Sequence, residues 1–120
     1  MIEVHTPRLL LRPPQIEDFE GWVEFCADEH TMEHLGGVQH EADVWRQFAS
    51  HAGIWSLGGP GMFTDIEKAT GKWVGRIGPW SPHLWPVQEV GWGILRRCEG
   101  KAYALEAAVA SIDYVFDVLL

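Results

Sequence analysis

The sequence predicts an α+β fold in which helices flank a central sheet that is mostly antiparallel. Residues 87–95 alternate apolar side chains with small or polar ones, the two-residue period of a strand, and residues 101–120 continue with apolar side chains at helical spacing. Residues 62–67 and 72–80 are strand-like and joined by a short polar turn, which predicts a hairpin. The complete order is strand, helix, helix, strand, strand, strand, helix.

Length and composition limit the class of protein. The chain has 120 residues, of which 47% are hydrophobic, and we expect a single domain over 1–120. A net charge of −8 argues against a nucleic-acid partner and suits a basic acceptor such as an amine. We expect no membrane span and no signal peptide. Cys26 and Cys98 are too few for a disulfide framework, so free thiols in a reducing cytoplasm are expected.

The first third of the chain predicts one strand and two helices. Residues 6–13 form the strand, with Leu9 and Leu11 on one face, and Pro13–Pro14 ends it. A helix over 15–27 carries an apolar face of Phe19, Trp22, Val23 and Cys26. Residues 32–37 form a turn-rich connection, and a second helix over 41–52 carries Trp45, Phe48, Ala49 and Ala52 on its apolar face. The glycine-rich run 57–61 ends that helix.

The last third predicts the hairpin, a third strand and the final helix. Gly71 closes the hairpin turn, where a positive φ is expected. Residues 81–86 lead to the strand over 87–95. In the final helix, over 101–120, the expected apolar stripe consists of Leu105, Ala108, Val109, Ile112, Val115, Phe116 and Leu119. We expect the sheet to cover one side of it and Val115, Phe116 and residues 118–120 to lie partly exposed.

The turn over 96–101 predicts an anion site. A turn that leads directly into a helix offers unpaired backbone N–H groups and the positive end of the helix dipole. Gly100 permits close approach of a ligand, and Arg96, Arg97 and Lys101 add positive charge, which together favour a phosphorylated ligand. Neither a GxxxxGK[ST] loop nor a GxGxxG loop between strand and helix is present. An ordinary strand-to-helix turn with solvated basic residues is the alternative.

Arg97-x-x-Gly100-x-Ala102 resembles the [Q/R]-x-x-G-x-[G/A] signature of the GNAT superfamily of acyl-CoA-dependent N-acetyltransferases. Four further runs resemble its branch related to ribosomal-protein alanine N-acetyltransferases: TPRLLLRP at 6–13, DF-x-x-W-x-x-F at 18–25, M-x-x-LGG at 32–37 and EKATGKWVGRIG at 67–78. The matches occur in the right order over essentially the whole chain. The resemblance implies the GNAT fold, with its mixed, mostly antiparallel sheet.

The resemblance also implies a ligand and its binding residues. The co-substrate is acetyl-CoA, the acceptor is an amine, and no metal is needed because the thioester is already activated. The strand before the loop would hold the pantetheine arm, with Gly93 leaving room for it, and the loop N–H groups of Cys98, Gly100 and Ala102 would hold the pyrophosphate. The implied coenzyme-binding residues are Trp92, Gly93, Ile94, Leu95, Arg97, Cys98, Gly100, Lys101 and Ala102.

Glu89 is the candidate general base, because relatives often carry a carboxylate on this strand and partial burial would raise its pKa. A strand-edge glutamate in solvent or in a salt bridge is the alternative. Asp65 and Glu67 are weaker candidates that fit a solvated hairpin face.

Trp80 and Trp85 could line an acceptor pocket or simply pack the core. His30 and His34, at i and i+4, lack an obvious third ligand, so we expect no metal site.

A relative would continue after residue 120 with a strand parallel to 87–95, a helix and two closing strands, so the chain is expected to be truncated at its C-terminus. Two functions therefore stand: an N-acetyltransferase acting on a protein N-terminus or a small amine, or a catalytically silent acyl-CoA-binding or interaction module. The open edge of the strand over 87–95 and the apolar end of the last helix predict self-association, most simply as a dimer.

Overall fold

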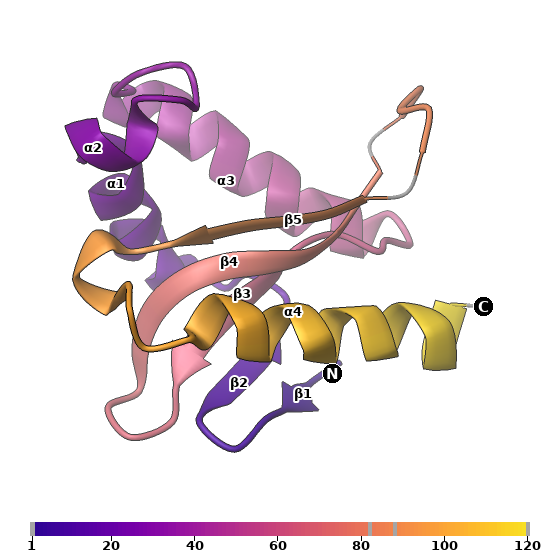
Figure 1. The fold of residues 1–120 in the computed structure, drawn as a ribbon. Helices are drawn as coiled ribbons and strands as arrows, with labels where there is room; N and C mark the ends of the chain where they lie inside the picture. The colour runs from indigo at the N-terminus through magenta and orange to yellow at the C-terminus, as the bar shows by residue number, and fades with distance from the viewer. Residues whose placement is uncertain (1, 82, 88, 120) are drawn as a thin grey trace.

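The computed structural model describes residues 2–81, 83–87 and 89–119, which form a five-stranded sheet with helices on both faces (Figure 1). The strands are β1 (Val4–His5), β2 (Leu9–Arg12), β3 (Phe63–Glu67), β4 (Lys72–Trp80) and β5 (Glu89–Ile94). They lie in sequence order, and each is antiparallel to the next. The helices are α1 (Phe19–Ala27), α2 (Glu29–Met32), α3 (Glu41–Ser56) and α4 (Tyr103–Tyr114). Two 3-10 turns, η1 (Ile16–Asp18) and η2 (Arg96–Cys98), precede α1 and α4, and a π-helical segment, η3 (Val115–Leu119), continues α4. The predicted α+β fold is confirmed.

The sheet separates two layers: α4 lies across one face, and α1 to α3 lie on the other (Figure 1). Because side chains alternate along a strand, paired residues share a face. The row on the α1 face is Arg12, Thr64, Arg76 and Gly93. The neighbouring row on the α4 face is Leu11, Asp65, Gly75 and Ile94. These two rows decide which candidate residues can meet.

A buried ion pair fixes the start of α1 against β2. The guanidinium of Arg12 donates to both carboxylate oxygens of Asp18, at 2.8 and 3.1 Å, and both residues are buried. The backbone N–H of Gln15 also donates to Asp18, at 2.7 Å. This pairing holds the entry to α1, whose buried side chains Trp22, Phe25 and Cys26 form much of the core.

The predicted hairpin is present, and its turn has the expected backbone. Gly71 has a φ of +73°, in the left-handed region that glycine adopts without strain. The β3–β4 register shifts between Asp65 and Ile66, a β-bulge that the sequence pattern did not reveal.

The N-terminal elements differ in detail from the prediction. Strand β1 and helix α2 were not predicted, and α3 continues to Ser56 instead of ending near residue 52. Its buried side chains are Val44, Phe48 and His51, so the predicted face with Trp45 and Ala49 is rotated away from the core. Trp45 is nonetheless packed edge-on against Phe19, with ring centroids 5.0 Å apart.

The predicted sheet-facing side of α4 is wrong for most of the helix. The buried residues are Tyr103, Ala107 and Ser111, whereas Leu105, Val109 and Ile112 of the predicted stripe are exposed. Phe116 and Val118, near the end of the chain, are exposed as predicted. Small side chains at 107 and 111 let the helix backbone approach β4 and β5 closely, and the large apolar residues then point away from the sheet. The predicted end of the helix, Leu120, lies outside the described residues.

Candidate functional site

The loop between β5 and α4 has the geometry of an anion cradle. Gly100 has a φ of +83°, and Ala102, which precedes the first residue of α4, has a φ of +62°. Left-handed backbone at an alanine costs about 1–2 kcal/mol. Residues in such strained conformations cluster at binding sites. The backbone N–H groups of Gly100 and Ala102 have no acceptor among the described residues. They are therefore available to an incoming anion at the positive end of α4.

Two of the predicted coenzyme-binding residues use their N–H groups within the fold. The N–H of Cys98 donates to the Leu95 carbonyl at 2.8 Å, and the N–H of Leu95 donates to the Val74 carbonyl at 2.8 Å. Both side chains are buried. The Cys98 N–H therefore already has an acceptor within the fold, and its role in holding a pyrophosphate stays a prediction. Cys98 and Leu95 anchor the loop to β4.

A pocket of about 370 Å³ borders the loop and the start of α4. It is lined by Ile94, Cys98, Glu99, Gly100, Ala102, Tyr103, Ala104 and Leu105. A side chain added at Gly100 would meet no atom within 4 Å, so the backbone at this position faces open space. Gly100 and Ala102 thus combine free donors with room for a ligand.

Each of the three cations predicted around the loop has a carboxylate partner. Arg97 Nε lies 3.2 Å from Glu24 and Arg96 Nη1 lies 3.8 Å from Asp28. Lys101 Nζ lies 4.0 Å from Glu67.

These carboxylates belong to the α1–α2 region and to β3, which the sequence could not place beside the loop. The hydroxyl of Tyr103 also donates to Glu67 and lowers the pKa of that carboxyl group. The cations are exposed, so a phosphate would compete with weak surface pairs for them.

Gly93 and Trp92 lie on opposite faces of β5. A side chain at Gly93 would collide with the Phe25 ring at 2.5 Å, so the glycine makes room for α1 and leaves no vacant slot for a ligand. Trp92 points to the α4 face and is 63% exposed, and Ile94 on the same face is half-buried. The other edge of β5 pairs with no strand in the described part of the chain. Its backbone groups are therefore free to bind an extended ligand.

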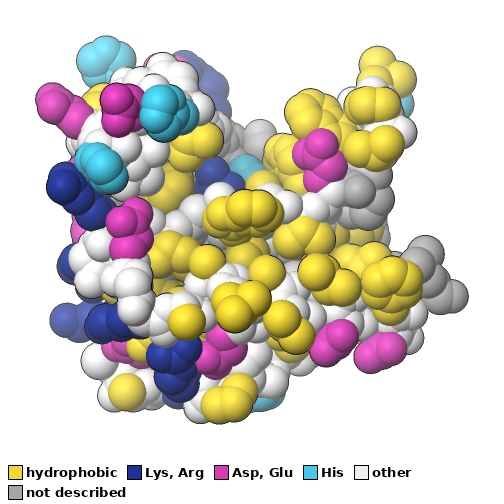
Figure 2. Space-filling model, in the orientation of Figure 1, with side chains coloured by type: hydrophobic (Ala, Val, Ile, Leu, Met, Phe, Trp, Pro, Cys, Tyr) yellow, Lys and Arg dark blue, Asp and Glu magenta, His cyan; other side chains and the backbone are white. Residues whose placement is uncertain are grey.

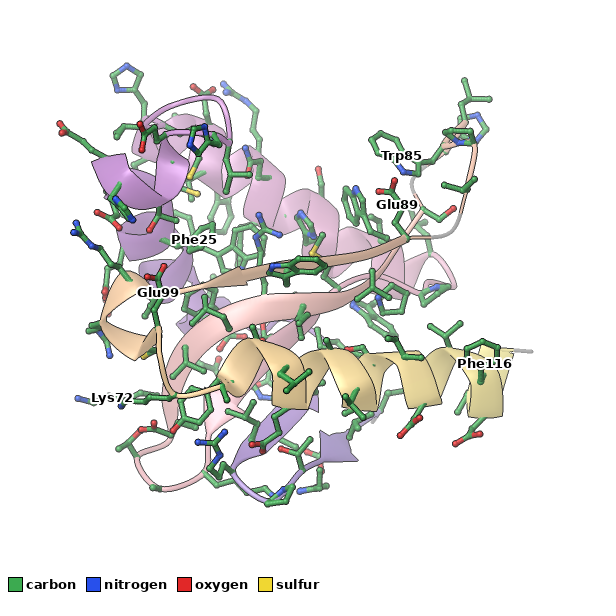
Figure 3. All side chains as sticks on the ribbon, in the orientation of Figure 1. Phe25, Lys72, Trp85, Glu89, Glu99 and Phe116 are labelled. Atoms are coloured by element: carbon green, nitrogen blue, oxygen red, sulfur yellow. The ribbon has the colours of Figure 1, made fainter. Side chains whose placement is uncertain are left out.

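Glu89 lies at the start of β5, opposite Trp80, and its side chain is exposed. The expected partial burial is wrong in this structure. Trp85, in the segment 83–87, and Glu89, at the start of β5, project from the same end of the molecule (Figure 3). Trp80 stacks on the buried His51 of α3, with ring centroids 4.5 Å apart. Glu89 thus borders an aromatic region on the α1 face of the sheet.

Residues 65 and 67 also differ from the prediction of a solvated hairpin face. Asp65 is fully buried on the α4 face, and neither of its carboxylate oxygens has a hydrogen-bond partner within the described chain. Burial raises the pKa of Asp65 well above its ordinary value. Glu67 is partly buried and accepts from the hydroxyls of Tyr103 and Thr70.

A group of polar side chains on the α1 face was not predicted from the sequence. Arg76, Thr64, His51 and Trp22 lie there, and each has a buried polar atom without a partner. Burial lowers the pKa of His51 to about 3, so the imidazole is neutral. Arg76 occurs in the VGRIG run of the hairpin, where an arginine between apolar strand residues was the available signal.

The described residues contain no group of three or more His, Cys, Asp or Glu side chains placed to hold a metal ion. Cys26 and Cys98 are buried and unpaired. In the part of the chain that the structure describes, none of the helices is both long enough and apolar enough to cross a membrane.

A cradle at a strand-to-helix turn, beside a strand with an open edge, is a site for a phosphorylated ligand with an extended arm. Residues 8–120 match the family described as an acetyltransferase (GNAT) domain. The chain belongs to this family, whose shared reaction is acetyl transfer from acetyl-CoA.

Solved structures agree with this assignment. An acetyltransferase from Agrobacterium tumefaciens str. C58 is 33% identical, with a TM-score of 0.87 over 99% of this chain and 69% of its own. A GNAT-family acetyltransferase from Bacillus anthracis is 27% identical, with a TM-score of 0.80 over 96% of this chain and 66% of its own. A Vibrio cholerae structure named for ribosomal-protein-serine acetylation shares the fold at 21% identity, with a TM-score of 0.79 over 98% of this chain and 68% of its own. The chain thus spans about two thirds of the length of these relatives.

Proposed function

We propose that the chain is an N-acetyltransferase that moves the acetyl group of acetyl-CoA to an amine, either a protein N-terminus or a small amine. The observation that carries the proposal is the pair of free N–H donors at Gly100 and Ala102 in left-handed backbone at the start of α4. Their position directly after β5 lets one ligand contact both the loop and the open strand edge. Arg97 and Lys101 would reinforce phosphate binding after exchanging their carboxylate partners.

The reaction needs a deprotonated amine beside the thioester carbonyl. Glu89 would take the ammonium proton, directly or through a water molecule, and its exposure leaves it accessible to such an acceptor. The amine nitrogen then attacks the carbonyl carbon, the C–S bond breaks, and the thiolate of coenzyme A leaves and takes up the proton that the nitrogen loses as the amide forms. Free N–H groups along the open edge of β5 could hold the pantetheine arm and polarise the carbonyl.

The open edge of β5 also supports the second candidate, a catalytically silent acyl-CoA-binding module. Calorimetry with acetyl-CoA and a thiol-release assay with a panel of amines separate the two. We expect binding together with amine-dependent thiol release. Binding without release for every amine would favour the silent module, and absence of binding would contradict both.

We further propose that the protein is cytoplasmic and self-associates, most simply as a dimer. Two buried unpaired thiols suit a reducing compartment. The exposed apolar face, which consists of Trp92, Leu105, Val109, Ile112, Phe116 and Val118, is contiguous over β5 and α4 in Figure 2. Monomeric proteins rarely leave such a face uncovered.

Light scattering tests the self-association. We expect a dimer at micromolar concentration and a shift to monomer for Phe116→Lys, which puts a charge on the apolar face. Trp45→Lys, at an exposed tryptophan on α3, is the matched control and should remain dimeric. A wild-type monomer would contradict the proposal.

A further inference from the structure

Arg76 is a largely buried cation without a carboxylate partner. Its guanidinium lies over the rings of Trp22 and Phe25, 5.2 Å from each centroid, and Nη1 is 3.1 Å from the sulfur of Met62. None of the ion pairs within 4.0 Å among the described residues includes it. Its Nε is buried without a hydrogen-bond partner. An uncompensated buried charge is strongly unfavourable, so a binding partner for the guanidinium is expected.

Neighbouring polar groups also lack hydrogen-bond partners among the described residues. Thr64 is directly opposite Arg76 in the sheet, and its buried hydroxyl has no partner in the described chain. The Trp22 indole N–H, which can only donate, is also unpaired, and its ring lies 4.7 Å from that of His51. These groups occupy one face of the sheet. Thr64 and Trp22 are fully buried, whereas Arg76 is partly exposed, so the guanidinium is the member of the group that an incoming acceptor can meet.

The nearby acidic groups do not fill this role. Asp65 is close enough to influence Arg76, but it lies on the opposite face of the sheet and its raised pKa favours the neutral acid. Burial raises the pKa of the Cys26 thiol, which keeps it protonated. Glu89 is on the same face as Arg76 but at the far end of β5 and exposed. Compensation must therefore come from outside this part of the protein.

The α1 face is open to solvent near these groups. Figure 2 shows a hollow between the lobe of α1 to α3 and the segment 83–87, with basic and histidine surface at its floor. Arg76 is neither fully buried nor fully exposed, and Trp80 and His51 stack beside this region. A ligand group can thus enter from solvent and meet a cation bordered by aromatic rings.

We propose that Arg76 binds a carboxylate of the amine acceptor, so that the acceptor is an amine that carries a carboxylate several bonds away. This inference rests on the proposed N-acetyltransferase function and on Glu89 as the base that takes the proton of the acceptor's ammonium group. Arg76 is opposite Gly93 in the sheet. Gly93 is four residues along β5 from Glu89, so the backbone positions of Gly93 and Glu89 are roughly 13 Å apart. Long side chains shorten the distance between their charged groups. An ω-amino acid or a dipeptide fits this separation better than an α-amino acid does.

Matched probes test the charge of the acceptor without requiring turnover. Calorimetry with 6-aminohexanoate and 6-aminohexanamide, each in the presence of coenzyme A, compares a carboxylate with its neutral amide. We expect the wild-type protein to prefer the carboxylate at least tenfold, since charge-assisted hydrogen bonds to arginine are strong. Diglycine and diglycinamide form a second pair. Equal binding of acid and amide in both pairs, or no binding of any probe, overturns the proposal.

Variants then assign the preference to Arg76. Arg76→Met, which keeps the apolar stem but removes the charge, should abolish the preference for the acid, and Arg76→Lys should keep part of it. Arg46→Met, which removes an exposed arginine of α3, is the control and should leave the preference unchanged. A preference that survives Arg76→Met overturns the assignment. Acetyl-CoA affinity, measured on the same samples, reports separately on the proposed function, because Arg76 lies away from the coenzyme loop.

Discussion

Gly100→Asp tests the coenzyme loop, and the structure separates its two effects. The side chain itself fits, since a Cβ at this position meets no atom within 4 Å. The φ of +83° already exists without ligand, so the strain of a non-glycine residue, about 1–2 kcal/mol, lowers the free energy of unfolding. The negative charge acts on ligand affinity instead.

The size of the charge effect follows from Coulomb's law. A carboxylate about 4 Å from a phosphate is repelled by about 1 kcal/mol in bulk water and by about 4 kcal/mol at an effective dielectric constant of 20. These energies correspond to losses of affinity between about 5-fold and several hundredfold. A loop exposed on one side should fall between these limits.

Calorimetry with acetyl-CoA measures this loss, and Gly100→Asn is the sharpest control because it has the same shape without the charge. Gly37→Asp places the same residue at a φ of +87° with equally open surroundings, but in the turn after α2. All three variants should lose stability to urea, and only Gly100→Asp should lose affinity strongly. Equal affinity of the Asp and Asn variants at position 100 would refute phosphate binding at this loop.

Three further predictions concern the base, the buried ion pair and a buried histidine. Glu89→Gln should lower turnover about 10²-fold or more with little change in coenzyme affinity, and an unchanged pH–rate profile would exclude Glu89 as the base. Asp18→Asn leaves Arg12 buried without a carboxylate and should lower the free energy of unfolding by about 3–5 kcal/mol, whereas Asp43→Asn, in the exposed Arg46 pair, should change it by less than about 1 kcal/mol. The pKa of His51 is about 3 when folded and near 6.5 when unfolded, so the unfolded state binds more protons between these values, and this residue lowers stability by about 1.4 kcal/mol per unit as the pH falls through that window. Urea titrations at several pH values should show a shallower fall for His51→Phe, and an identical pH dependence would contradict this assignment.

The elements that local chemistry decides could be predicted from the sequence. The turn at Gly71 needs a positive φ, and the alternation over 89–94 needs an extended backbone, so both were predicted where they occur. The loop at 96–101 was found because a turn that leads directly into a helix predicts unpaired backbone N–H groups. The left-handed backbone of Gly100 and Ala102 was not predicted.

The side of a helix that packs is a tertiary property, and α4 shows why periodicity alone misassigned it. A stripe of large apolar residues at helical spacing establishes amphipathicity but does not identify what covers the stripe. In the structure Ala107 and Ser111 pack against β4 and β5, and Leu105 remains 68% exposed. The small residues Ala107 and Ser111 indicated the face that packs on the sheet, but a hydrophobicity pattern gives small residues little weight.

Contacts between distant segments account for the other differences. Glu24 of α1 pairs with Arg97, and Glu67 of β3 lies near Lys101, so the cations of the loop are already neutralised in part. Asp65 is buried because the register places it opposite Leu11 and Gly75 beneath α4. Neither outcome has a local sequence signal, because both depend on how the sheet is assembled.

The open edge of β5 links the two proposals about binding. A second copy that paired with this edge would use the backbone groups that a pantetheine arm needs, so dimerisation and coenzyme binding would exclude each other. A dimer formed through the exposed apolar face of α4 and Trp92 would leave the edge free, and the two events would be independent. Light scattering with and without saturating coenzyme A therefore distinguishes these arrangements. Dissociation on adding coenzyme A would place the contact at the strand edge, and an unchanged dimer would place it on the apolar face.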